Sequence, residues 1–169
     1  MIPYDLTTRE NMILYFSLKN KKGYSLDNRE EIIKNISDEL NEYTKDFECV
    51  IIPESSSDFL ELVIKNLNKP YIKLRKNNIE YFKNLAPTLG LQKAELRSHL
   101  QRMEEMGETF KINMLKANQR VHYMKHLFKQ TYVPQNSVLV DDSNFSGTTF
   151  EALRDSTGIS FYIPIFSKV

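Results

Sequence analysis

The first clear pattern in the chain is helical. Five apolar residues recur at helical spacing between positions 32 and 43, namely Ile32, Ile33, Ile36, Leu40 and Tyr43. This periodicity predicts an amphipathic helix over residues 27–46. Asp27 is the expected N-cap, because Glu30 follows three residues later as its capping-box partner.

A strand, a polar turn and a second helix come next. Residues 47–52 form a short β-branched run that Pro53 stops, which is typical of a buried strand. After the polar residues 53–58, residues 59–67 place apolar side chains on one side of a helix, and residues 70–74 alternate as a second strand does. This order predicts a βαβ unit with parallel strands and a right-handed crossover.

The end of the chain repeats the same order. Residues 137–141 are apolar and β-rich, and residues 142–148 form a polar turn. A helix is expected to begin near Phe150 and to end at Gly158, before a final strand over residues 159–163. Two such units predict an α/β fold built on a small parallel sheet.

The central part of the chain has a heptad pattern. Ten positions between 96 and 128 follow alternating steps of four and three residues, and nine are apolar, the exception being Gly107. The pattern predicts a helix over about residues 93–129, or a helix pair with a kink or hairpin turn at Gly107. One continuous helix would be roughly 55 Å long, which is more than a small sheet can cover. We therefore expect a homodimer through residues 93–130.

These patterns divide one domain, residues 1–169, into three parts. Residues 1–46 are the N-terminal helical part, residues 47–76 and 133–169 form the α/β core, and residues 77–132 are a helical insertion. The length fits a single domain of about 100–200 residues.

Composition adds a compartment and a charge pattern. The single cysteine, Cys49, cannot form an internal disulfide, which is typical of a reducing compartment. The N-terminus resembles no secretory signal, and no run of 18 apolar residues occurs, so we expect a cytoplasmic protein without membrane contact. Residues 71–132 carry a net charge of +7 between flanks of −4 and −2. This division favours either an anionic ligand or a solvated, Lys-rich helix.

The segment with the clearest chemical meaning spans residues 138–149. An apolar strand ends in Asp141 and Asp142, and small hydroxyl residues surround Gly147 before a helix begins. Backbone N–H groups and hydroxyls at a helix start can hold a phosphate, while carboxylates accept hydrogen bonds from sugar hydroxyls. Open α/β folds bind ligands at the carboxyl ends of their strands. The pattern therefore predicts a sugar-phosphate site.

This run, VLVDDSNFSGTT, resembles the signature with which the type I phosphoribosyltransferase family binds phosphoribosyl pyrophosphate (PRPP). A second run, PESSS at residues 53–57, resembles the pyrophosphate loop of the same family, in the Pro-acid-Ser form of the PRPP amidotransferases. Both motifs occur in the family's order. The resemblance covers residues 47–76 and 133–165, and it implies a sheet of the type I phosphoribosyltransferase kind.

The resemblance implies three groups of substrate-binding residues. The ribose hydroxyls of PRPP would be bound by Asp141 and Asp142. The 5′-phosphate would be bound by Ser143, Asn144, Phe145, Ser146, Gly147, Thr148 and Thr149. The pyrophosphate would be bound by Glu54, Ser55, Ser56 and Ser57, together with the cations Lys73, Arg75 and Lys76.

The activity implied by the resemblance is Mg²⁺-dependent transfer of the phosphoribosyl group to a small nitrogenous acceptor, with release of pyrophosphate. Mg²⁺ would be held mainly by PRPP itself. Phe145 stands where the hypoxanthine-guanine enzymes have the Asp of proton transfer, and an aromatic ring there would instead suit stacking on a flat acceptor. Glu54 would repel the pyrophosphate unless it faces Mg²⁺ or solvent.

A second interpretation is a non-catalytic regulator that binds PRPP or a nucleotide and contacts nucleic acid through its basic helices. Salt-sensitive binding of nucleic acid without turnover would distinguish the regulator from the enzyme. The histidines His99, His122 and His126 lie in the central segment without a carboxylate or cysteine at metal-ligand spacing. We therefore expect no metal site made of protein ligands alone.

Overall fold

One sheet of five parallel strands forms the centre of the fold, which the computed structural model describes for residues 1–168. The strands are β1 (Tyr4–Asp5), β2 (Cys49–Pro53), β3 (Tyr71–Leu74), β4 (Ser137–Asn144) and β5 (Tyr162–Ser167). Their spatial order is β1-β5-β4-β2-β3, and every neighbouring pair is parallel. The prediction of an α/β fold on a parallel sheet is confirmed.

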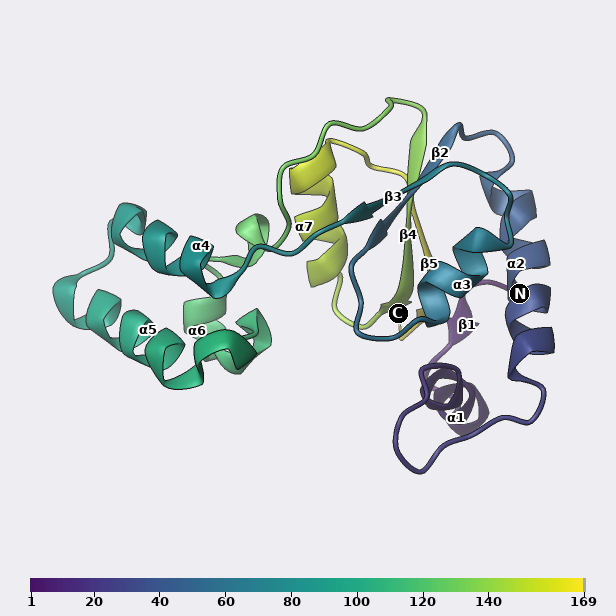
Figure 1. The fold of residues 1–169 in the computed structure, drawn as a ribbon, viewed down its shortest axis with the longest axis horizontal. Helices are drawn as coiled ribbons and strands as arrows, with labels where there is room; N and C mark the ends of the chain where they lie inside the picture. The colour runs from purple at the N-terminus through teal and green to yellow at the C-terminus, as the bar shows by residue number, and fades with distance from the viewer. Residues whose placement is uncertain (169) are drawn as a thin grey trace.

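Helices cover both faces of this sheet (Figure 1). They are α1 (Arg9–Leu18), α2 (Arg29–Thr44), α3 (Phe59–Lys65) and α7 (Thr148–Thr157). Successive strand residues point to opposite faces, so Val50 and Val138 join the apolar core beneath α1, α2 and α3. Ile51 and Leu139 point the other way and belong to the core that includes Leu153 of α7. Apolar residues on both faces explain why these strands appear in the sequence as unbroken apolar runs.

The predicted βαβ unit and the helix after the second motif are confirmed. β2 and β3 pair in parallel, with Ile51 beside Ile72, and α3 connects them. α7 ends at Gly158, whose φ of +76° is the left-handed conformation that commonly terminates helices.

The predicted start of α2 is wrong by one residue. Its N-cap is Asn28 rather than Asp27, because residues 27–28 form a turn and the helix begins at Arg29. Glu30 then lies only two residues after the N-cap, one short of the capping-box position.

The last two strands differ from their predicted bounds. β4 continues past Asp141 to Asn144, because β5 runs beside it as far as the pair Asn144 and Ser167. β5 begins at Tyr162 and passes through Pro164, where the sequence suggested that the strand had ended. β1 pairs with β5 only from Phe166 onwards, so β5 is an edge strand at Pro164, where a residue without an N–H group is tolerated.

The sequence suggested a purely helical N-terminal part, but this part also contains a strand. β1 adds a strand to the edge of the sheet beside β5, and α1 follows it with the Thr8 hydroxyl accepting from Asn11 N–H at its start. Ile2 and Leu6 are buried in the same core as α2. Residues 1–46 therefore belong to the α/β core.

Between β3 and β4 the chain forms a separate helical body, here called the helical lobe (residues 77–127), which projects from the core (Figure 1). Its helices are α4 (Ile79–Leu85), α5 (Lys93–Met106) and α6 (Ala117–Arg120). Its 3-10 helices are η1 (Ala86–Leu89), η2 (Gly107–Thr109), η3 (Ile112–Met114) and η4 (Met124–His126). Within residues 1–168 no helix is both long and apolar enough to cross a membrane.

The predicted continuous helix over residues 93–129 is wrong. α5 ends at Gly107, which has a φ of +53° and ψ of −140°, a combination that L-residues with a side chain rarely adopt. The chain then folds back in short turns, so that Met103 packs with Phe82 and Tyr123 in a core of the lobe's own. Part of the stripe is thus covered within a single chain, while Met114 and Val121 are exposed, and the homodimer stays a prediction.

Two substitutions on the stripe should have unequal effects. Phe110 is half-buried, and its ring lies 6.0 Å from that of Phe82, so Phe110→Glu should lower the free energy of unfolding by about 2 kcal/mol. Met114 is 38% exposed, and Met114→Glu should change it by less than about 0.5 kcal/mol. Chemical denaturation measures both. Dissociation of a dimer by either variant, seen in sizing experiments, would instead support a seam between subunits.

Candidate functional site

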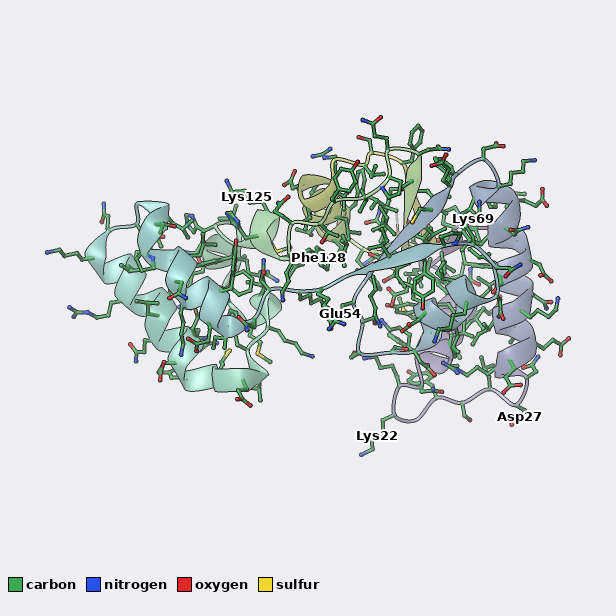
Figure 2. All side chains as sticks on the ribbon, turned by 45° about the horizontal axis from the view of Figure 1, so that its top comes forward. Lys22, Asp27, Glu54, Lys69, Lys125 and Phe128 are labelled. Carbon is green, nitrogen blue, oxygen red and sulfur yellow. The ribbon has the colours of Figure 1, made fainter. Side chains whose placement is uncertain are left out.

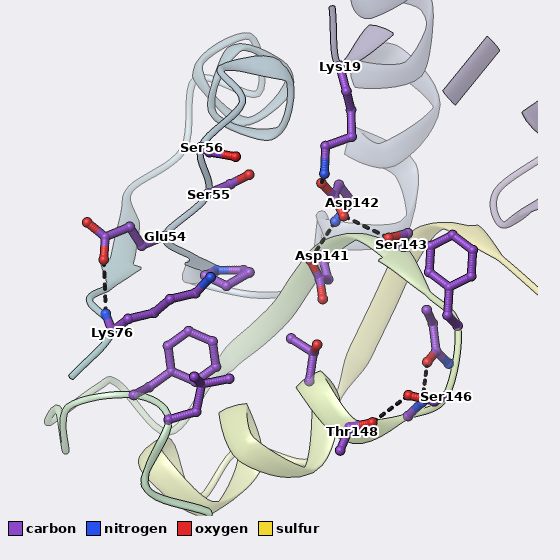
Figure 3. A pocket seen from close by; sticks show the side chains of 17 residues that line it. Lys19, Glu54, Ser55, Ser56, Lys76, Asp141, Asp142, Ser143, Ser146 and Thr148 are labelled. Carbon is purple, nitrogen blue, oxygen red and sulfur yellow. Dashed lines mark hydrogen bonds and ion pairs between the residues drawn. The ribbon is translucent and has the colours of Figure 1, made fainter. Parts of the chain in front are cut away.

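Two loops from distant parts of the sequence meet above the carboxyl ends of β2 and β4. These strands are neighbours, with Ile51 opposite Leu139, so the loops that follow them lie at the same edge of the sheet. Between the loops is a cavity of about 270 Å³ (Figure 3). Its walls consist of Pro53, Glu54, Ser55, Ser56, all residues from Asp141 to Thr149, and Lys19, Lys76, Leu127 and Phe128.

The two acidic residues of β4 point to opposite faces of the sheet and have different partners. Asp142 faces α1, where its carboxylate accepts from Lys19 Nζ at 2.5 Å and from the Ser143 hydroxyl at 2.9 Å. Both side chains of the ion pair are mostly buried. The Tyr15 hydroxyl extends the network, since it lies 2.9 Å from Ser143 Oγ and accepts from Lys19 at 3.2 Å. Asp142 is thus held in one position by α1.

Asp141 is buried without a cation at such short range. Its Oδ1 accepts from the backbone N–H of Asp142 at 2.8 Å. Burial, and then the negative charge of Asp142, raise the pKa of Asp141 to about 7. Burial and the two carboxylates also raise the pKa of the Tyr162 phenol. A carboxylate that is costly to ionise in the empty protein will ionise more readily when a cation comes close.

The loop after β4 is shaped to present backbone groups at the start of α7. Gly147 has a φ of +77°, and its N–H donates to Asn144 Oδ1 at 2.8 Å. The hydroxyls of Ser146 and Thr148 are hydrogen-bonded to each other (Figure 3). A helix start carries unpaired N–H groups and a partial positive charge, which suits a phosphate.

The loop after β2 divides between the cavity and the next helix. Ser55 and Ser56 line the cavity, whereas Ser57 accepts from the backbone N–H of Phe59 at 3.3 Å and so caps the start of α3. The Glu54 carboxylate accepts from the backbone N–H of Lys76 at 3.0 Å (Figure 3). That hydrogen bond directs the Glu54 charge toward the edge of the cavity and reduces the repulsion expected from the sequence.

Only one of the three predicted cations reaches the cavity. Lys76 lines it, and its side chain extends inward. Lys73 forms an ion pair with Glu61 at 3.0 Å on α3, because alternation along β3 turns it away from the loop. Arg75 contributes its backbone carbonyl to Lys129 N–H at 2.9 Å and is not among the lining residues that the structure describes.

Sequence reasoning missed Lys19, Tyr15 and Phe128. Leu14 and Leu18 stand at helical spacing after Thr8, which is a signal that could have located α1. No local pattern connects Lys19 to Asp142, since the pair is joined only by the packing of α1 against the end of β4. Phe128 reaches the cavity wall because it bridges to Lys76 where the lobe returns to the core.

The histidines occupy the lobe, away from the cavity. His99 and His122 have ring centroids 5.7 Å apart, and Glu95 lies 3.5 Å from His122 Nε2. The His99 Nδ1 is hydrogen-bonded to the Tyr123 hydroxyl at 2.8 Å. Among the side chains described, none form a group of three or more metal ligands.

Gly147→Val tests the loop conformation. A Cβ at Gly147 would meet nothing within 4 Å, so the expected cost comes from the positive φ and not from a clash. Holding a β-branched residue there should lower the free energy of unfolding by about 1–2 kcal/mol, or shift the loop and weaken phosphate binding. Gly147→Asn is the control, because Asn adopts this conformation more easily. Equal effects of the two variants, measured by denaturation and anion binding, would contradict the strained-loop argument.

Comparisons with protein-family models, with curated proteins and with solved structures found no match to this chain.

Proposed function

We propose that the protein binds PRPP with Mg²⁺ and transfers the phosphoribosyl group to a nitrogenous acceptor, releasing pyrophosphate. One observation supports this above the others: both motifs that resemble the type I phosphoribosyltransferases line the same cavity. The parallel sheet brings the two loops together, and the groups that meet there are those that PRPP requires: carboxylates, hydroxyls, a helix start and the Lys76 ammonium. Parallel sheets often bind ligands at this edge, but that rule by itself names no ligand.

Each part of PRPP has a chemically suitable counterpart in the cavity. The 5′-phosphate fits the start of α7, where the hydroxyls of Ser146 and Thr148 and the N–H groups of the first helical turn are donors. The ribose hydroxyls are donors suited to Asp141 and Asp142. The pyrophosphate would then extend toward Ser55, Ser56 and the Lys76 ammonium, which neutralises charge that grows on the leaving group.

The residues around the cavity also fit Mg²⁺. Glu54, Asp141 and Asp142 line it, and carboxylate oxygens are the ligands that Mg²⁺ prefers. Since the described side chains make no complete metal site, Glu54 or Asp141 would hold the ion only together with oxygens of PRPP. When bound, Mg²⁺ supplies positive charge that stabilises the departing pyrophosphate.

The reaction we propose is a displacement at C1′. A nitrogen lone pair of the acceptor forms the new N–C1′ bond, the bond from C1′ to pyrophosphate breaks, and pyrophosphate leaves with that electron pair. The side chain of Phe145 at the loop tip cannot accept a proton, so the acceptor nitrogen loses its proton to solvent after the N–C1′ bond has formed and the product is released. The protein contributes orientation, charge neutralisation and exclusion of water.

Release of pyrophosphate from PRPP tests the proposal. A panel of nitrogenous acceptors with Mg²⁺ should include at least one that gives acceptor-dependent release. Asp141→Asn should remove this release, and Asp27→Asn, in the exposed turn before α2, should not. Absence of turnover together with salt-sensitive binding of nucleic acid would favour the regulator over the enzyme.

A further inference from the structure

A second and larger cavity adjoins the first, in the cleft between the α/β core and the helical lobe. Its volume is about 1110 Å³, slightly above the roughly 300–1,000 Å³ of small-molecule sites. Ser56, Lys76 and Thr148 line both cavities, so a molecule in the cleft would lie next to the proposed PRPP. Figure 2 shows Glu54 and Phe128 where the lobe meets the core.

Four cations line the cleft: Lys76, Lys111, Arg120 and Lys125. Within residues 1–168, none of them takes part in an ion pair. By contrast, Lys83 elsewhere on the lobe is paired with Glu104 at 2.7 Å. Unpaired cations that face one hollow raise its potential and favour an anion there.

The cleft also has an apolar and aromatic wall. Phe82, Phe110 and Met124 line it from the lobe, as does Val121, which is 68% exposed. An exposed β-branched residue beside aromatic rings and cations suits a flat molecule that has both an apolar face and a negative charge.

Acidic residues of the cleft limit where the negative charge can sit. Glu151 and Asp155 also line it, three and seven residues after Thr148 along α7. These two carboxylates repel an anion more strongly the farther it lies from the start of α7. Lys76 and the helix N-terminus attract an anion at the near end. The anionic group is therefore expected between Lys76 and the cations of the lobe.

We infer that this cleft is the acceptor site, and that the acceptor is a flat nitrogen heterocycle carrying a phosphate or carboxylate group. The role of the bound molecule as an acceptor rests on the proposed function. The binding of an anionic aromatic molecule in the cleft does not. The heterocycle packs against Phe110 and Val121, and its anionic group pairs with Lys111, Arg120 and Lys125. Lys76 is shared, since it faces PRPP on one side and the cleft on the other.

Pyridoxal 5′-phosphate is a suitable probe, because it is a flat heterocycle with a phosphate and its aldehyde can be fixed to a nearby lysine by borohydride. Peptide mapping should show that it labels Lys111 or Lys125 about 10-fold faster than pyridoxal does, as expected when a phosphate gains one or two charge-assisted hydrogen bonds. Arg120→Gln should remove most of that difference. If Arg120→Gln folds poorly, Lys125→Gln, at an exposed site, takes its place, and the labelling of Lys111 by the two compounds is compared again. Lys34, on the exposed side of α2, gives the intrinsic ratio of the two rates, by which the ratio at the lobe lysines is divided, because the 5′-hydroxyl of pyridoxal closes on its own aldehyde and slows its reaction at every lysine.

The outcomes separate the inference from the proposed function. PRPP with Mg²⁺ should protect Lys76 and leave labelling of Lys111 and Lys125 unchanged. Selective labelling of the cleft without protection of Lys76 would overturn PRPP binding but retain the anionic site. A ratio of labelling by the phosphate to labelling by pyridoxal that is no higher at the lobe lysines than at Lys34 would overturn the cleft as an anion site. Protection of the lobe lysines by a single-stranded oligonucleotide, but not by nucleoside monophosphates, would overturn the inference that the cleft binds a small acceptor.

Discussion

Asp141→Asn should make the protein more stable at pH 8 while removing its affinity for PRPP. The carboxyl is buried and lies beside Asp142, so its ionised form is costly in the native state. Asn has the same shape and retains an oxygen to accept the Asp142 N–H. With a pKa of about 7, the gain should be roughly 2–4 kcal/mol in the free energy of unfolding.

The pH dependence gives this prediction its sign. The native pKa of Asp141 lies above the ordinary value of 3.8, so between about pH 4 and pH 7 the native state holds a proton that the unfolded state has lost. The free energy of unfolding of the natural protein therefore falls across this window as pH rises, and the contribution is constant above it. In Asp141→Asn this fall should be absent, so the two proteins should converge in stability near pH 4.

Asp155→Asn is the matched control, because Asp155 is an exposed carboxylate on α7 and its replacement should change stability by less than about 0.5 kcal/mol. Urea denaturation at pH 4, 6 and 8 measures all three proteins. A variant Asp141→Asn that is less stable than the natural protein at pH 8 would contradict the argument that Asp141 is an electrostatic cost.

Lys19→Met should have a large effect in the opposite direction. The Lys19 and Asp142 side chains are 14% and 11% exposed and meet at 2.5 Å. Removing one partner of a mostly buried pair leaves the other charge uncompensated, which typically costs about 3–5 kcal/mol. Here water at the cavity lowers the expected loss to about 3 kcal/mol in the free energy of unfolding. The loss of the Lys19 contacts should also free Asp142 and weaken PRPP binding.

Lys34→Met provides the comparison for this pair. Lys34 and Asp38 meet at a similar distance, 2.7 Å, but both are more than 60% exposed. An exposed pair of this kind is worth about 0.3–0.5 kcal/mol. A double-mutant cycle of Lys19→Met with Asp142→Asn should recover part of the loss, because the second change removes the unpaired charge. Similar small losses in Lys19→Met and Lys34→Met would show that burial adds nothing to the Lys19 pair.

The sequence was most informative where local pattern and tertiary environment agree. β2, α3, β3 and the β4 to α7 segment are dense in apolar residues and bounded by proline, glycine or short polar turns. Both loops of the cavity follow such strands, so their meeting could be expected from the rule that parallel strands end at one edge. The roles of Ser55, Ser56 and Lys76 as cavity residues follow from the same reasoning.

Other features depend on contacts between distant residues. β1 has two residues and exists because β5 offers an edge to pair with, and no local pattern specifies so short a strand. Lys19 meets Asp142 across 123 positions of sequence. The heptad pattern left open whether residues 93–129 continue as one helix or turn at Gly107, because a period of apolar residues does not record tertiary contacts. The turn places Met103 in one core with Phe82 of α4 in the same molecule.

Thermal unfolding with PRPP and Mg²⁺ tests the central claim most directly. A ligand that binds only the native state at 100 times its Kd adds about 2.7 kcal/mol to the free energy of unfolding, which corresponds to a rise in Tm of roughly 5–10 °C for a chain of this size. Ribose 5-phosphate, which lacks the pyrophosphate, should give a smaller rise. A Tm that stays unchanged in millimolar PRPP and Mg²⁺ would contradict the account of this cavity as a PRPP site.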